Sequence, residues 1–136
     1  WQQLEDYVLN NAGAHDLRVC VITGPVLRAS DRPYRGILLP EEFWKVVVLV
    51  KETGELSATG YVLSQKDMIS GLEAAFAFGA FKTYQVPIQR IAEMTGLDFG
   101  RLPEFDPLQR VRPEAVGLEA AATGVVQVTG PASLVL

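Results

Sequence analysis

The chain has 136 residues and a formal net charge of −4, a size that indicates one domain able to bury about two thirds of its unfolded surface. Nucleic-acid binders that work by bulk electrostatics are usually basic overall, so any contact with phosphate must come from a local patch. The single cysteine, Cys20, excludes an intramolecular disulfide and a cysteine-rich metal site, and the longest apolar runs are too short for a membrane span.

The first segment has the spacing of an amphipathic helix. Trp1, Leu4 and Val8 recur at helical intervals and Ala12 extends this apolar face, with Glu5 beside its edge. No capping residue precedes Trp1 and there is no initiator Met, so we interpret the start as a cut inside a longer structure. On residue types alone, the favoured alternative is an ordinary surface helix in which Glu5 is a solvated acid.

Two strands and a loop are predicted next. The run Leu17–Thr23 is β-branched and nearly all apolar, which predicts a central strand that ends at Gly24 and buries Cys20 as an inert thiol. From Val26 to Gly36 there is no periodicity, so this segment is predicted to be a surface loop. A short extended piece, Ile37–Leu39, follows it.

The strongest strand signal lies in the middle of the chain. Phe43–Val50 is predicted to pair antiparallel with Leu56–Ser64 across a turn that contains Gly54. Strand alternation leaves Lys45 among apolar residues on its own face, so its ammonium must snorkel or find a carboxylate or carbonyl partner. A structural role for Lys45 is favoured over a catalytic one.

The second half of the chain gives fewer signals. Thr83–Ile88 is predicted to be extended, and Gln89–Thr95 a short helix that ends at Gly96 as a left-handed C-terminal cap. Pro103 and Pro107 exclude a regular element around them. Weaker expectations are a helix within Asp67–Phe81, a helix at Glu114–Ala122 and a late strand at Val125–Thr129. The elements together predict an α+β fold, with a central antiparallel sheet flanked by helices.

Two groups of arginines are candidates for contact with nucleic acid. Guanidinium groups bind phosphate bidentately and a tyrosine can stack on a base, which singles out Arg28, Arg32, Tyr34 and Arg35. Asp31 partly offsets their charge, and a solvated surface is the favoured alternative. A looser group consists of Arg101, Arg110 and Arg112, which are interleaved with Glu104 and Asp106.

Five short motifs occur in one order along the chain: Trp1–Glu5 (WQQLE), Val21–Pro25 (VITGP), Leu39–Val46 (LPEEFWKV), Tyr84–Ile88 (YQVPI) and Met94–Phe99 (MTGLDF). Together they resemble the C-terminal half of the DNA/RNA non-specific endonucleases, sugar-nonspecific nucleases with a ββα-metal (His-Me finger) active site. The resemblance covers about residues 1–108. It implies that residues 1–108 form the C-terminal part of a nuclease domain, and it leaves 109–136 as a C-terminal extension of unknown role.

The resemblance implies a specific role for one residue. In that family the glutamate of the Trp-x-x-Leu-Glu helix contacts water bound to a single divalent metal, and the match assigns this role to Glu5. The metal-binding asparagine and the Asp-Arg-Gly-His motif that activates the attacking water precede that helix, and this sequence contains neither. The arginine that some members carry one turn after the glutamate is replaced by Leu9. The fold is thus expected to be ββα-metal nuclease-like, without its N-terminal part.

Physical chemistry also indicates that the isolated chain lacks a complete catalytic site. One carboxylate cannot hold Mg²⁺ or Mn²⁺, and phosphodiester hydrolysis also needs a general base. His15 is the single histidine, and in the predicted helix it begins about 10–15 Å along the axis from Glu5. It therefore cannot be assumed to replace the missing base, and a residue at the helix end is the favoured interpretation.

The leading hypothesis is a fragment of a metal-dependent, non-specific endonuclease that is inactive alone. Its expected partners are the DNA or RNA backbone and the missing N-terminal part of the nuclease, with no membrane involved. The alternative is a non-catalytic α+β module for interaction or oligomerisation, for example a homodimer. Members of the resembled family are commonly secreted or mitochondrial, and secretion would be expected of a typical bacterial member, although no residue here reports the compartment.

Overall fold

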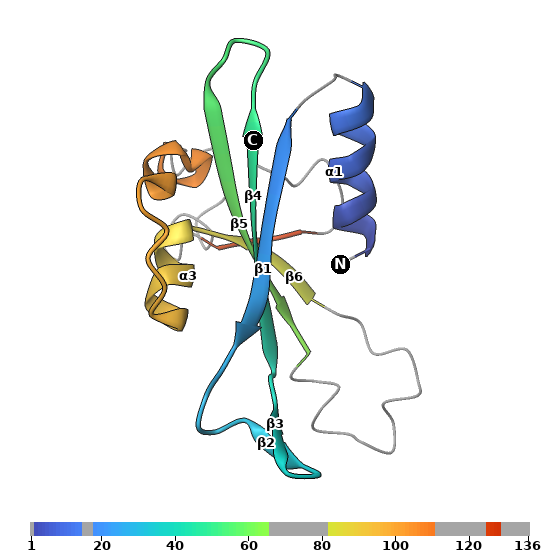
Figure 1. The fold of residues 1–136 in the computed structure, drawn as a ribbon, viewed down its shortest axis with the longest axis vertical. Coiled ribbons are helices and arrows are strands. Elements are labelled where there is room, and N and C mark those ends of the chain that lie inside the picture. The colour runs from blue at the N-terminus through green and yellow to red at the C-terminus, as the bar shows by residue number, and fades with distance from the viewer. Residues whose placement is uncertain (1, 15–17, 66–81, 111–124, 129–136) are drawn as a thin grey trace.

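In the computed structural model, the described residues are 2–14, 18–65, 82–110 and 125–128. Within them, two α-helices lie on opposite sides of an antiparallel sheet (Figure 1): α1 (Gln2–Ala14) and α3 (Ile88–Thr95). The sheet has the strand order β1-β4-β5-β6-β7, and β2 and β3 form a separate two-stranded ribbon. The predicted α+β class and the central antiparallel sheet with flanking helices are confirmed. The sheet consists of β1 (Val19–Val26), β4 (Glu42–Val50), β5 (Leu56–Ser64), β6 (Lys82–Val86) and β7 (Val126–Gln127).

Strands β4 and β5 lie side by side in the sheet, which confirms the antiparallel pair predicted from their sequences. They pair antiparallel over their full nine residues, with Lys45 opposite Tyr61 and Val47 opposite Thr59. The turn between them contains Gly54 at φ 83°, a left-handed conformation that glycine adopts without a Cβ clash. The β4–β5 hairpin therefore provides the rigid base on which both helices pack.

Each face of the sheet has its own apolar cluster. On the α3 side, Trp44 and Val46 of β4 pack with Ile88 and Ile91 of the helix. On the α1 side, Val47 and Tyr61 pack with Leu4 of α1, and Val8 lies against them. These contacts confirm the apolar face predicted for Leu4 and Val8. The α3 side contains more of the buried residues, so the larger part of the described core lies between the sheet and α3.

Helix α3 ends as its sequence predicted. Gly96 adopts the left-handed conformation, φ 71° and ψ 11°, and its backbone N–H donates to the carbonyl of Ala92 at 2.8 Å. Beyond it, the expectation that prolines exclude regular structure was partly wrong. Pro103 and Pro107 stand in the first turns of two short 3₁₀ helices, η1 (Leu102–Phe105) and η2 (Pro107–Gln109), where the missing proline N–H costs nothing.

Strand β1 corrects three predictions. It is an edge strand, paired with β4 alone among the described strands, and it runs through Gly24 and Pro25 to Val26. An edge strand tolerates proline because the proline nitrogen need not donate to a neighbour. Cys20 is exposed, so the prediction of a buried thiol was wrong as well. The apolar run was correctly recognised as a strand, but its predicted central place in the sheet was wrong, because most of its residues are exposed.

The predicted loop between Val26 and Gly36 contains a strand. β2 (Arg32–Tyr34) pairs with β3 (Ile37–Leu39) in a hairpin that extends from the lower end of the molecule (Figure 1). Its two-residue turn has Arg35 at φ 49° and Gly36 at φ 84°, the positive pair that a type I′ turn requires. The usual Asn-Gly or Asp-Gly signal is absent, which explains why the hairpin was missed.

Several predictions concern residues outside the described ranges. These are the helices expected within Asp67–Phe81 and at Glu114–Ala122, and the placements of Trp1 and His15. The late strand predicted at Val125–Thr129 is confirmed in part, because β7 occupies Val126–Gln127 and pairs with β6.

Candidate functional site

Glu5 is positioned by the apolar face of α1. Leu4, one residue before it, is buried against the sheet, and Val8, one turn later, packs on the same cluster. A residue next to this stripe on a helix points along the surface of the sheet rather than away from it. The side chain of Glu5 is 51 % exposed, and it reaches Lys45 at the centre of β4.

Lys45 donates a hydrogen bond from its Nζ to Oε1 of Glu5, and the two form an ion pair. The lysine side chain is only 4 % exposed. This contact confirms that Lys45 finds a carboxylate, as its position among apolar residues predicted. The hydrogen bond from Lys45, and secondly its charge, hold the pKa of Glu5 below its usual value. Glu5 is therefore a carboxylate at neutral pH.

The pairing of these two residues is the part of the site that sequence analysis missed. Each was singled out by itself, Lys45 as a cation on an apolar face and Glu5 as an acid at the edge of an apolar stripe. They are 40 residues apart in the chain. The sequence did indicate a lysine that needs a partner and an acid at the edge of an apolar helix face. Only the packing of α1 on the sheet shows that these two side chains meet.

The described residues fit one part of a metal site. Among them no group of three or more His, Cys, Asp or Glu side chains lies close enough together to hold an ion. Mg²⁺ requires near-octahedral oxygen coordination and keeps several waters. A half-exposed carboxylate such as Glu5 can accept hydrogen bonds from such waters, whereas the direct ligands would have to come from residues outside the described ranges.

Arg28 lies away from Glu5. Its guanidinium pairs with Glu42 at the start of β4, and its backbone N–H donates to the buried carboxylate of Asp31 at 2.8 Å. Strand alternation puts Glu42 and Lys45 on opposite faces of β4. Arg28 is thus held in a local turn, and the structure does not bring it to the Glu5 carboxylate.

The other three candidates for nucleic-acid contact share the β2–β3 hairpin. Arg32, Tyr34 and Arg35 are all exposed there. The guanidinium of Arg35 lies over the ring of Tyr34, 5.2 Å from its centroid, a distance typical of a cation–π contact. The hairpin therefore presents a cation and an aromatic ring together at the lower end of the molecule (Figure 1).

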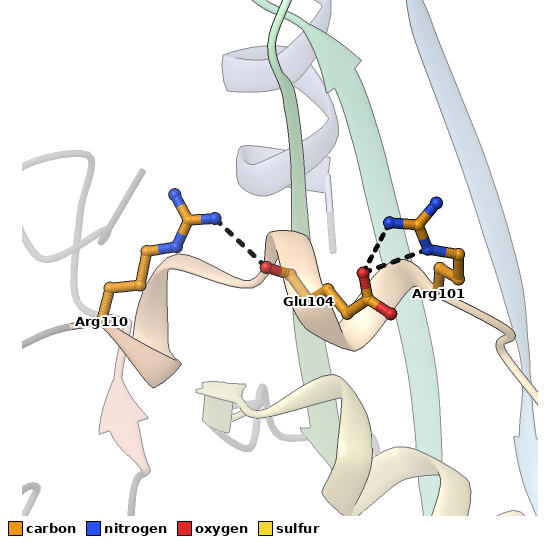
Figure 2. Close-up of polar contacts among 3 residues, drawn as sticks. All are labelled: Arg101, Glu104 and Arg110. Atoms are coloured by element: carbon orange, nitrogen blue, oxygen red, sulfur yellow. Dashed lines mark hydrogen bonds and ion pairs between the residues drawn. The ribbon is translucent and has the colours of Figure 1, made fainter.

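In the second arginine group, Arg101 pairs with the carboxylate of Glu104. Figure 2 shows Arg101 and Arg110 on either side of Glu104. Arg101 donates to the Glu104 carboxylate from Nε at 3.1 Å and from Nη2 at 2.8 Å, and Arg110 donates to the Glu104 carbonyl at 3.2 Å. The hydrogen bond and charge of this pair hold the pKa of Glu104 below its usual value and raise that of Arg101. Arg112 lies outside the described residues.

Comparison with known proteins identifies the relationship. Residues 1–104 match the family described as DNA/RNA non-specific endonuclease. The chain belongs to this family. The match ends near the division predicted at residue 108, but it does not test whether residues 109–136 form a separate extension. None of the described helices is long and apolar enough to cross a membrane.

A relative of this chain is found in Sinorhizobium fredii, under the name "Uncharacterized protein y4fB". The two are 36 % identical over 107 residues, which cover 73 % of this chain and 16 % of the relative. The matched segment is thus a small part of that longer protein. No solved structure shows a significant match to the chain.

Proposed function

We propose that this chain carries part of the catalytic site of a metal-dependent endonuclease that hydrolyses phosphodiester bonds in DNA or RNA. The observation that carries the proposal is Glu5. By the resemblance of Trp1–Glu5 to the family's Trp-x-x-Leu-Glu segment, it would take the place of the glutamate there, and it is a half-exposed carboxylate paired with Lys45. Membership of the family supports the reaction class, and the geometry of Glu5 supports its role beside a hydrated cation.

In this proposal, a bound Mg²⁺ or Mn²⁺ would offset the negative charge that develops on the phosphodiester and would lower the pKa of a water that it binds. Glu5, ionised at neutral pH, accepts hydrogen bonds from water around that cation and so orients it. The general base and the direct metal ligands are the histidine of an Asp-Arg-Gly-His motif and an asparagine. This sequence contains no such motif, so both are proposed to lie outside these 136 residues, and the chain alone is proposed to be inactive.

The β2–β3 hairpin is proposed to contact the nucleic acid. Arg32 and Arg35 would bind backbone phosphates, and Tyr34 would stack on a base. Arg28, which pairs with Glu42, would contribute through the shape of the adjoining turn as well as its charge. With a net charge of −4, the chain has no general attraction for phosphate, so these local residues would supply the contact.

Activity assays test the proposal. The purified chain should not cleave DNA or RNA with Mg²⁺ or Mn²⁺, whereas the parent protein containing the His and Asn motifs should, and EDTA should abolish the activity. Glu5→Ala in the parent should lower turnover by about 10- to 100-fold, the usual cost of losing a group that orients metal-bound water. Glu93→Ala, at an exposed position of α3, is the matched control.

Two results would contradict this proposal. The first is robust, EDTA-sensitive cleavage by the purified chain alone, which would show that no outside residue is needed. The second is an unchanged turnover in the Glu5→Ala parent protein. Reading the translated gene upstream of Trp1 is a further check, because an Asp-Arg-Gly-His motif and a following asparagine should be found there.

A second candidate is a non-catalytic module for interaction, including self-association. It is favoured by apolar side chains exposed on the edge strand and hairpin, namely Val21, Ile22, Ile37 and Leu38. Exposed apolar residues beside an unpaired strand edge promote association. This candidate would replace the first if the full-length gene product also lacks the His and Asn motifs. Sedimentation of wild type and Ile22→Lys would then show whether β1 forms a homodimer contact.

A further inference from the structure

Lys45 is a buried cation on the most strongly supported strand of the sheet. Strand β4 is paired on both sides, with β1 and with β5, so the backbone at Lys45 is fixed from two directions. On its own face Lys45 has Phe43 and Val47 along the strand. Its side chain is 4 % exposed. An ammonium in such surroundings is stable only when an anion or several acceptors surround it.

The two residues opposite Lys45 on the neighbouring strands do not supply an anion. Thr23 of β1 donates its hydroxyl to the carbonyl of Trp44 at 2.7 Å. Tyr61 of β5 is buried, and burial raises the pKa of its phenol to about 12, so it is neutral at neutral pH. Glu5 of α1 is the anion that these contacts bring to the lysine.

The ion pair is asymmetric. Lys45 is almost fully buried, whereas Glu5 remains half-exposed, with Oε1 taken by the lysine. A pair that served only to tie α1 to the sheet would not need the carboxylate to stay in contact with solvent. The asymmetry has a different consequence: the sheet, through Lys45, sets the position of a carboxylate that is carried by a helix. The rest of that carboxylate stays available to water.

We propose that Lys45 is a positioning residue of the endonuclease site, which holds Oε1 of Glu5 so that the carboxylate presents its exposed side to the water of the active site. This inference rests on the proposed function. Lys45 itself touches neither the phosphate nor the metal. It acts on the reaction by fixing one rotamer of Glu5, as residues behind a metal-site ligand commonly do.

The experiment uses the full-length parent protein with four variants: Lys45→Met, Lys45→Arg, Glu5→Gln and, as matched control, Lys51→Met. Lys51 is an exposed lysine one residue beyond the end of β4. Lys45→Met should lower kcat about 10- to 100-fold and leave KM for nucleic acid within about twofold, because substrate contacts are unchanged. Lys45→Arg, which keeps a cation, should recover part of kcat, and Lys51→Met should match wild type.

A second readout does not depend on activity. In metal-free protein at pH 7, the NMR resonance of the Glu5 side-chain carboxyl carbon should move towards that of a free glutamate in Lys45→Met and stay unchanged in Lys51→Met. A crystal structure of the Lys45→Met variant should show the carboxylate in more than one rotamer, with the backbone of α1 and β4 unchanged.

The outcomes separate this inference from the function on which it rests. If Glu5→Gln leaves turnover unchanged, the proposed function itself is wrong. If Glu5→Gln lowers kcat while Lys45→Met does not, or does so only in proportion to lost folded protein, the positioning role is wrong and the pair is a structural tie.

A double variant covers the case in which Lys45→Met does not fold. Glu5→Gln with Lys45→Met removes both charges, and with them the cost of a buried unpaired charge. Residues that act as one unit are not additive, so its kcat should equal that of Glu5→Gln alone. A further loss of more than about threefold would show that Lys45 acts on turnover independently of Glu5, which would overturn the inference.

Discussion

At Gly60 of β5, the backbone of β6 and the side chains of α3 come close together. A Cβ built at this position would lie 2.6 Å from the carbonyl oxygen of Val86 and 2.9 Å from Cδ1 of Ile91. The contact with a backbone atom cannot be relieved by a rotamer change. A hydrogen is therefore the only substituent that lets α3 and β6 pack at this distance.

We expect Gly60→Ala to destabilise the protein by about 1–3 kcal/mol through overpacking, measured by urea unfolding. Gly13→Ala is the matched control, because a Cβ there has nothing within 4 Å. In helix α1 it should stabilise by up to about 1 kcal/mol. Equal stability of Gly60→Ala and wild type would show that the close approach is not maintained in solution.

At the scale of an element, α3 is held by a residue distant in sequence. Pro87 precedes the helix and offers no side-chain cap. Instead, the Ile88 N–H donates to Oδ2 of Asp106 at 2.8 Å, and Oδ1 of the same carboxylate accepts from Leu108 at 3.0 Å. Asp106 is fully buried. One side chain thus joins the start of α3 to η2.

Asp106→Ala should therefore cost about 1–3 kcal/mol, because the buried N–H of Ile88 loses its acceptor. Urea unfolding measures this loss. Asp98→Ala is the control: Asp98 also accepts a backbone hydrogen bond, from Gly100, but it is exposed. Its removal should cost less than about 0.5 kcal/mol. Similar losses in the two variants would contradict the role assigned to Asp106.

Asp106 should also give stability a distinct dependence on pH. Burial raises its pKa above the usual 3.8, and this outweighs the two hydrogen bonds, which act in the opposite direction. The folded state then binds a proton more tightly than the unfolded state, so this contribution to stability falls as pH rises from 3.8 through the folded pKa. The stability of wild type minus that of Asp106→Asn should decrease across this range. An increase would mean that the hydrogen bonds dominate.

Elements with a strong local signal were predicted well, and those defined by their neighbours were not. Alternation identified β4 and β5, and Gly96 identified the end of α3, because both signals lie within the element. The place of β1 at the sheet edge depends on which strands lie beside it in the sheet, and its own residues do not encode this. Arg35 carries a conformation normally taken by Asn, Asp or Gly, so the hairpin had no recognisable turn. The pairing of Glu5 with Lys45 likewise required the packing of α1.

For the whole molecule, the positions of the charged residues matter more for nucleic-acid binding than the net charge does. The net charge is −4, the guanidinium of Arg101 is paired with Glu104 (Figure 2), and Arg32 and Arg35 lie exposed on the β2–β3 hairpin. Binding of a single-stranded oligonucleotide, measured by fluorescence anisotropy, should therefore be weak and should be lost in Arg32→Ser with Arg35→Ser. Each phosphate contact removed should reduce the salt slope by about 0.7.

Arg101→Ser is the matched control for that experiment. Arg101 is exposed, like the hairpin arginines, but its guanidinium is occupied by Glu104. Its replacement should change affinity by less than about twofold, a difference of about 0.4 kcal/mol. If Arg101→Ser weakens binding as much as the hairpin variant does, nucleic acid contacts η1 rather than the hairpin.

The unequal division of the apolar interior has a consequence for opening motions. In the described part of the chain, α1 is anchored by a small cluster around Leu4, Val47 and Tyr61, whereas α3 shares the larger one. Regions with few buried contacts open first. In a hydrogen-exchange experiment, the backbone amides of α1 should exchange well before those of β5 and α3. Glu5 would then leave with its helix while the sheet stays intact, so the carboxylate would be lost from its place without global unfolding.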